Sequence, residues 1–144
     1  MRRAHLAGAG SGGLAAAVVV LALSGLAAGC SSSSSEPAYC TDASQLKTSV
    51  QDLGNVDVAK NGLGSLQTAL SSVQADAKTF AADAKSAFSS QTAALNTALA
   101  GLQTAITSAK GQPPLTAATA VASSVTQVKD SAGALQSAVS GNCQ

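Results

Sequence analysis

The feature that most constrains the fold of this chain is a run of apolar residues with helical spacing between Leu63 and Ala84. Successive members lie three or four residues apart without interruption: Leu63, Leu66, Leu70, Val73, Ala77, Phe80 and Ala84. This spacing places their side chains on one stripe of an α-helix, as in the heptads of coiled coils. The pattern predicts a long helix that must bury its stripe against other helices.

A shorter apolar stripe precedes this run. It consists of Leu46, Val50 and Leu53. The stripe predicts a short first helix, with Thr41 or Asp42 as its N-cap and Gly54-Asn55 as its stop. The following segment, Val56 to Gly64, is either a connection or a frayed start of the second helix.

A third stripe lies one residue out of phase with the one that ends at Ala84. Its members are Leu95, Leu99, Leu102, Ile106 and Ala109. A phase shift indicates either a stutter in one long helix or a turn between two helices. We expect a turn near Ser89-Ser90, because an unbroken helix from Leu63 to Lys110 would be about 72 Å long with nothing of equal length to pack on.

The last stripe follows the sequence "GQPP", Gly111 to Pro114, which is typical of a helix stop followed by a helix start. Its members are Ala118, Val121, Val125, Val128, Ala132, Leu135 and Val139. Gly133 within this helix costs roughly 1 kcal/mol relative to alanine. Short connections make successive helices antiparallel neighbours. The sequence therefore predicts an all-α fold, a small antiparallel bundle of three long helices and one short N-terminal helix.

Composition and charge argue against a nucleic-acid partner. Both arginines and the only histidine lie within the first five residues, and from Cys30 onward six lysines stand against six aspartates and one glutamate, without clusters. Aromatic residues make up 2% of the chain, and tryptophan is absent. Neutralisation of phosphates and stacking on bases therefore have little support, and we expect no nucleic acid to bind.

The first 29 residues have the pattern of a secretory signal peptide. Arg2 and Arg3 form a basic start, and an apolar run extends from Leu14 to Ala28. A permanent membrane-spanning helix is the weaker alternative, because this run spans only about 22 Å of a roughly 30 Å hydrocarbon core.

The end of this segment, "LAAGC" from Leu26 to Cys30, resembles the lipobox of bacterial lipoproteins, in which small residues precede an obligatory cysteine. The family prefers Leu, Val or Ile three residues before the cysteine, where this chain has Ala27. The resemblance implies that the signal is removed and that Cys30 becomes the lipidated first residue, held on the extracytoplasmic face of the cell membrane. The alternative is a buried or disulfide-bonded Cys30 after an ordinary signal peptide.

A serine tract separates Cys30 from the helical part. "SSSSSEP", from Ser31 to Pro37, has no apolar period and ends at a proline. It predicts a flexible tether, so that the expected organisation is a signal peptide over 1–29, a lipidated tether over 30–39 and a bundle domain over 40–144.

With Cys30 assigned to lipid by the lipobox resemblance, Cys40 and Cys143 are the remaining thiols. In an up-down-up-down bundle the start of the first helix and the end of the fourth lie together, and an exported compartment favours oxidation. We therefore expect a Cys40–Cys143 disulfide. Two free thiols or a bridge between chains are the alternatives.

The predicted mature chain offers little for catalysis or cofactors. It has no histidine, which excludes Ser-His-Asp triads, Cys-His dyads and histidine metal sites. Asp52 and Asp57 flank a Gly-Asn turn, where acids usually are solvated or cap helices. "NGLG", from Asn61 to Gly64, lacks the glycine spacing and the lysine of a phosphate loop. We expect no catalytic residue, metal ligand or cofactor, and no enzymatic activity.

Two groups of residues have other interpretations. Asp76, Lys78, Asp83 and Lys85 repeat every seven residues, which favours a solvated outer face of the second helix. Val56, Val58 and Leu115 lie outside a clear stripe. These three either cap the ends of the core or form an apolar patch for a partner.

The Ala-, Gly- and Thr-rich composition resembles that of small lipoproteins from high-GC actinobacteria, many of which have no assigned activity. The sequence thus predicts a non-enzymatic module of the cell envelope that binds a protein or wall component, or acts as a spacer. A carrier of a lipid or other apolar ligand between the helices is the alternative, and requires a cavity of several hundred Å³.

Overall fold

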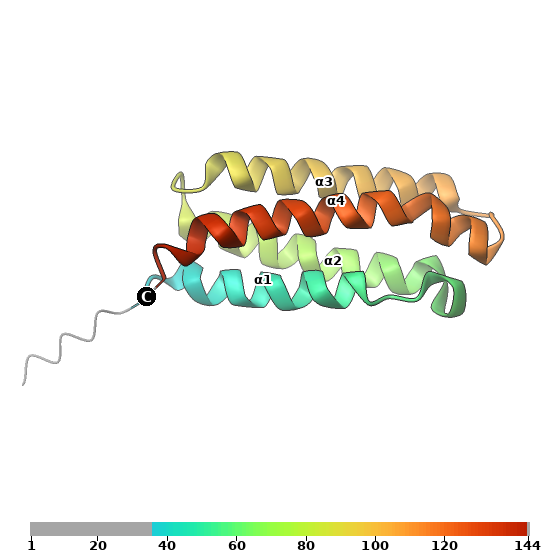
Figure 1. The fold of residues 1–144 in the computed structure, drawn as a ribbon, viewed down its shortest axis with the longest axis horizontal. Coiled ribbons are helices and arrows are strands. Elements are labelled where there is room, and N and C mark those ends of the chain that lie inside the picture. Colours follow the sequence, from blue (N-terminus) through green and yellow to red (C-terminus); the bar gives the residue numbers. More distant parts are fainter. Residues whose placement is uncertain (1–35, 144) are drawn as a thin grey trace, which may run out of the picture. The chain divides into compact units, whose positions relative to one another are not determined.

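The computed structural model describes residues 36–143, which form an antiparallel bundle of helices (Figure 1). The helices are α1 (Ala38–Gly54), α2 (Val58–Ala84), α3 (Ser89–Ala109) and α4 (Pro114–Ser140). Each helix packs on the next along the chain, α4 also packs on α1, and α2 and α4 meet across the bundle. The predicted all-α fold, with one short and three longer helices, is confirmed. The predictions for the signal peptide, Cys30 and the serine tract concern residues outside the described range.

The predicted apolar stripes form the core. Residues with no exposed surface come from three of the helices: Leu70, Val73, Phe80, Leu95, Leu102, Ile106 and Val128. α1 adds Leu46 and Leu53, which are 2% and 1% exposed. The stripe of α4 differs from the prediction at its start, where Ala117 is buried and Ala118 only half-buried. None of the helices within 36–143 is both long and apolar enough to cross a membrane.

The predicted N-cap of α1 was wrong, because the helix begins at Ala38 rather than after Thr41 or Asp42. Pro37 precedes the helix, and its carbonyl accepts a hydrogen bond from the Cys40 N–H at 2.9 Å. Tyr39, which the sequence assigned to the tether, is half-buried on the core. Burial of Tyr39 and Cys40 therefore extends the helix. Its end at Gly54-Asn55 is confirmed.

The turn between the second and third helices lies earlier than the predicted Ser89-Ser90, since α2 ends at Ala84 and α3 starts at Ser89. The two helices are separate, as expected. The turn contains Phe88, which is 7% exposed and packs 5.5 Å from the Tyr39 ring, centroid to centroid. Burial of this ring fixes the position of the turn. Helical periodicity cannot predict such a contact, because the two rings are far apart in the sequence.

The segment from Val56 to Gly64 combines both of the predicted alternatives. Val56 lies in the connection, and α2 begins at Val58 with Asp57 as its N-cap. The helix is interrupted at Gly62, where φ is +77°. Glycine adopts this backbone conformation without a steric penalty, so the short first turn of α2 is set off from the long segment that follows.

Cys40 and Cys143 form a disulfide, with their Cα atoms 5.7 Å apart. It joins the start of α1 to the residues after α4 and thereby confirms the predicted pairing in this fold. In Figure 1 these two chain ends lie at one end of the bundle, and the α1–α2 and α3–α4 connections lie at the other. We call these the disulfide end and the distal end.

Removal of the disulfide should reduce stability strongly. The bridge spans 103 residues, for which the chain-entropy model gives a contribution of about 4.7 kcal/mol. The double variant Cys40→Ser/Cys143→Ser should lose free energy of unfolding on this order in guanidinium titrations. Reductant should lower the stability of the wild type and leave the double variant unchanged. Equal stability of the oxidised and reduced wild type would contradict the prediction.

Lys85 should be a position where glycine stabilises the protein. Its backbone has φ +52° and ψ −120°, a region unfavourable for residues with a Cβ atom. Lys85→Gly should raise the free energy of unfolding by about 1 kcal/mol. The matched control is Lys78→Gly, the same change in the exposed middle of α2, which should lower stability by about 1 kcal/mol. Thermal unfolding followed by circular dichroism measures both effects, and a loss in both variants would refute the argument.

Candidate functional site

Three hollows of the bundle surface lie along one face, where α1 and the α1–α2 connection meet α4. They follow one another from the distal end to the disulfide end, with volumes of about 350, 180 and 230 Å³. We call them the distal cleft, the lysine groove and the disulfide pocket. Lys129 lines both of the first two, and Gln136 lines both of the last two. The hollows therefore form one interrupted channel along the α1–α4 face.

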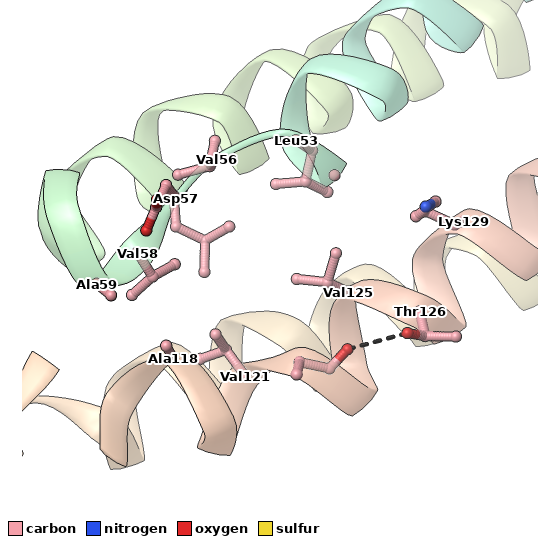
Figure 2. Close-up of a pocket in the computed structure, with 13 residues that line it drawn as sticks. Leu53, Val56, Asp57, Val58, Ala59, Ala118, Val121, Val125, Thr126 and Lys129 are labelled. Carbon is pink, nitrogen blue, oxygen red and sulfur yellow. Dashed lines mark hydrogen bonds between the residues drawn. The ribbon is translucent and has the colours of Figure 1, made fainter. Parts of the chain in front are cut away.

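The distal cleft lies between the α1–α2 connection and α4 (Figure 2). One wall carries Val56 and Val58, and the other carries Val121 and Val125. Val58 and Val121 belong to the core at 6% and 2% exposure, whereas Val56 and Val125 are half-buried. The floor of the cleft is thus the outer surface of the apolar core.

Lys129 occupies the boundary between the distal cleft and the lysine groove. A Cβ atom built on Gly54 would lie 3.2 Å from Cδ of this lysine, so its aliphatic stem crosses the end of α1 where that helix lacks a side chain. The negative end of the α1 dipole favours a cation there. Gly54, which ends α1, therefore also leaves room for the aliphatic stem of Lys129.

The lysine groove has an apolar floor between two cations. Val50 and Ala132 are buried beneath it, while Lys47 stands on α1 and Lys129 on α4. Gly133 also lines the groove, and a Cβ atom at this position would meet nothing within 4 Å. Among residues 36–143, no acidic side chain lines this groove.

The disulfide pocket is not a metal site. Glu36, Cys40 and Cys143 place a carboxylate oxygen and two sulfur atoms within 4.8 Å of one another. Both sulfur atoms belong to the disulfide, so neither is available as the thiolate that binds metals. A single exposed carboxylate remains, which is too few ligands for a metal ion.

Of the two acidic residues predicted on a solvated face of α2, Asp76 packs towards α1, whereas Asp83 is exposed as predicted. Asp76 is half-buried and accepts a hydrogen bond from the Ser49 hydroxyl. Asp83 lies one heptad further along α2 and faces Asp42, which lies one heptad before Ser49 on the antiparallel α1. The α1–α2 interface thus pairs Asp76 with Ser49, and one heptad further along α2 it pairs Asp83 with Asp42. Lys78 and Lys85 are exposed, as predicted.

The Asp42 carboxyl group is unusual among the acids of the bundle. It is 9% exposed, and its Oδ2 atom is buried without a hydrogen-bond partner within residues 36–143. Burial raises the pKa of Asp42, and the facing Asp83 carboxyl group raises it further, with a smaller contribution from Asp76. A hydrogen bond between Asp42 and Asp83 requires that one of them carries a proton.

Asp52 and Asp57 do not share a site. Asp52 is exposed on α1, whereas Asp57 caps α2 by accepting a hydrogen bond from the Lys60 N–H at 3.1 Å. The Lys60 side chain forms a salt bridge with Asp57 at 3.2 Å, and this interaction lowers the pKa of the Asp57 carboxyl group. The predicted capping role is confirmed for Asp57. "NGLG" forms the interrupted start of α2.

Of the three apolar residues outside the stripes, Val56 and Val58 take the predicted role at the end of the core, and Leu115 does not. Val58 is a core residue, and Val56 packs against the core from the connection. Leu115 is 76% exposed at the start of α4, next to the distal end.

The sequence did not reveal the lysine groove, because Lys47 and Lys129 come from helices far apart in the chain. One signal for this surface was available in the sequence. Spacings of three and four residues place Ala118, Ala122, Val125 and Lys129 on one face of α4.

No protein-family model matches this chain, and no curated protein or solved structure is significantly similar to it.

Replacement of Asp42 by asparagine should stabilise the bundle at neutral pH. The amide keeps the shape of the side chain, carries no buried charge and can donate a hydrogen bond to Asp83. We expect a gain of about 1 kcal/mol in the free energy of unfolding at pH 7, comparable to the cost of an unpartnered buried polar atom.

The pH dependence provides the second readout. A raised folded pKa means that the folded protein holds a proton that the unfolded chain releases. The contribution of Asp42 to stability should therefore be fully present below the ordinary Asp value of 3.8 and be lost as the pH rises through the raised value. Asp42→Asn should flatten this slope in unfolding titrations at a series of pH values. Asp130→Asn, an exposed control on α4, should not. A less stable Asp42→Asn variant at pH 7 would count against this interpretation.

Proposed function

We propose that this protein is a lipid-anchored, extracytoplasmic helical module of the cell envelope that acts by binding rather than by catalysis. The observation that carries the proposal is the placement of the distal cleft relative to the disulfide end. The chain enters the bundle through Glu36 and Pro37 at the disulfide end, six residues after the lipobox-like cysteine in the sequence. α4, with 27 residues, separates this end from the distal end by about 40 Å.

The anchor follows from the signal-like segment and Cys30. Two or three acyl chains on this cysteine would hold the protein stably in a membrane, whereas a single chain would give marginal attachment. The serine tract would then act as a tether between the lipid and the bundle. In this arrangement the distal end points away from the membrane and towards other envelope components.

Binding is favoured over catalysis by the kind of side chains that line the α1–α4 face. Apolar residues, two lysines and two glutamines line the lysine groove, and the acid at the distal cleft, Asp57, is engaged as a helix cap. Such a surface supports recognition of an envelope protein or cell-wall component. Where no partner binds, the bundle would serve as a spacer.

A second candidate function is carriage of an apolar ligand. The centre of the bundle is filled by side chains such as Leu70, Phe80 and Ile106, which have no exposed surface. A ligand would therefore lie in the distal cleft, whose volume of about 350 Å³ is near the lower end of the range for small-molecule sites, roughly 300–1,000 Å³. The exposed lining of this cleft is more polar than apolar, so the cleft supports the carrier less well than the binding module.

Substitution of Cys30 by serine should abolish membrane attachment. Cys30→Ser removes the thiol that would accept the lipid, so the protein should accumulate as a precursor or leave the membrane fraction. Ser33→Ala, a change in the same tract, should have no effect. Fractionation of washed membranes and the mass of the N-terminal peptide measure both outcomes. Unchanged membrane retention of a correctly processed Cys30→Ser protein would refute the anchor.

A further inference from the structure

We infer that the lysine groove binds an acidic segment of a partner protein, with one aromatic side chain of that segment seated between Lys47 and Lys129. The inference rests on the proposed binding function and assigns its site and the chemistry of its partner. It requires an apolar floor of suitable size, unneutralised cations beside that floor, and a reason why the chain itself does not supply the bound segment.

Of the three hollows on the α1–α4 face, the lysine groove is the one whose exposed lining is mainly apolar. Val50 and Ala132 are buried beneath it, and Gly133 contributes no side chain to fill it. Its volume of about 180 Å³ is close to that of a cavity that holds one benzene ring, about 150 Å³. The groove therefore has room for one aromatic side chain.

Contacts between α1 and α4 limit the groove along its length. Towards the disulfide end, the Gln136 side-chain amide donates a hydrogen bond to the Ala43 carbonyl at 2.7 Å. Towards the distal end, the stem of Lys129 crosses the end of α1 at Gly54. A helix that docks in a groove presents several apolar anchors, which need more space than this groove provides. A short segment with a single apolar anchor fits instead.

Both walls of the groove carry a cation. Lys47 stands on α1 and Lys129 on α4, and neither takes part in a salt bridge within residues 36–143. Asp52 and Asp130 follow groove residues in the sequence but do not line the groove, because adjacent positions of a helix face different directions. Acidic side chains on either side of an anchor complement the two ammonium groups. A lysine beside a bound ring also adds a cation–π attraction, which favours an aromatic anchor.

The chain itself offers no segment of this kind. Within residues 36–143, Leu115 is the one large apolar side chain that is highly exposed. The nearest acids in the sequence are Asp83 and Asp130, so Leu115 lies in a long stretch without negative charge. The 35 residues before Glu36 contain neither an acidic nor an aromatic residue. The chemistry of the groove therefore favours a different protein over a second copy of this chain or its own N-terminal segment.

Gly133 offers a way to fill the groove without disturbing the core. This glycine is exposed on α4, and a Cβ atom there meets nothing within 4 Å, so Gly133→Leu should fold and occupy the groove with its own side chain. Gly64 on α2 is likewise exposed and free of neighbours, and it lines none of the three hollows. Gly64→Leu is therefore a matched control for the same chemical change.

The experiment uses the full chain in nanodiscs of zwitterionic phosphatidylcholine. The probe is a fluorescent peptide in which a photoreactive benzoylphenylalanine stands between two pairs of aspartates. Fluorescence anisotropy measures its affinity, and peptide mass spectrometry after irradiation locates the crosslink. We expect crosslinks within residues 47–51 and 129–136. A peptide with serine at the aromatic position, and one with asparagine at the aspartate positions, should each bind roughly tenfold more weakly.

Variants of the protein separate the apolar contact from the charge contact. Gly133→Leu should weaken binding of the aromatic peptide roughly tenfold, and Gly64→Leu should leave it unchanged. Lys47→Gln and Lys129→Gln should each weaken binding about threefold, as expected for the loss of one exposed charge pair. These two surface substitutions test the site even where Gly133→Leu lowers stability, which circular dichroism measures in parallel.

Several results would overturn the inference. Equal binding of the serine peptide, or equally strong competition by polyglutamate, would show attraction between charges without an apolar anchor. Crosslinks confined to the distal cleft or the disulfide pocket would reject the lysine groove and keep binding at the α1–α4 face. Absence of binding by every peptide would reject an acidic partner. The membrane anchor is tested independently through Cys30, so its failure would not be confused with any of these results.

Discussion

The structure depends on burial of regularly spaced, mostly small apolar side chains between antiparallel helices. Burial of apolar surface supplies the main driving force for folding, and the stripes determine which face of each helix is removed from water. Alanine and valine at many stripe positions allow the helices to approach closely. Where alanine and glycine also flank the stripe, as Ala118 and Gly133 do on α4, the surface is left hollow. The small residues that permit tight packing in the centre of the bundle thus also leave hollows along the α1–α4 face.

The two ends of the bundle are built differently. At the disulfide end, all three aromatic residues of the chain gather, with Tyr39 and Phe80 6.4 Å apart and Phe80 and Phe88 5.9 Å apart between ring centroids. The Cys40–Cys143 bridge closes this end covalently. The distal end has neither the aromatic cluster nor the disulfide, and it contains the interrupted start of α2. The covalent and aromatic contacts are therefore concentrated where the chain enters the bundle, and the distal cleft lies at the opposite end.

Much of the fold was predictable because helical periodicity is a local signal. The four stripes, the stop at Gly54 and the helix start at Pro114 follow from neighbouring residues alone, and the structure confirms them. The turn after Ala84 and the start of α1 were misplaced because each is decided by burial of an aromatic ring, Phe88 or Tyr39, against residues distant in sequence. The interpretation of Asp76 failed for the same reason, since its partner, Ser49, lies on another helix.

The sequence by itself determined the class of fold and the order of its helices. It also carries the signal-like segment and Cys30, on which the proposed anchor rests. Only the tertiary structure decided that Lys47 and Lys129 share one groove, that Gly54 makes room for a lysine stem, and that Asp42 meets Asp83. These relations depend on the relative positions of packed helices, which are set by side-chain shape and burial over the whole bundle rather than by any local period.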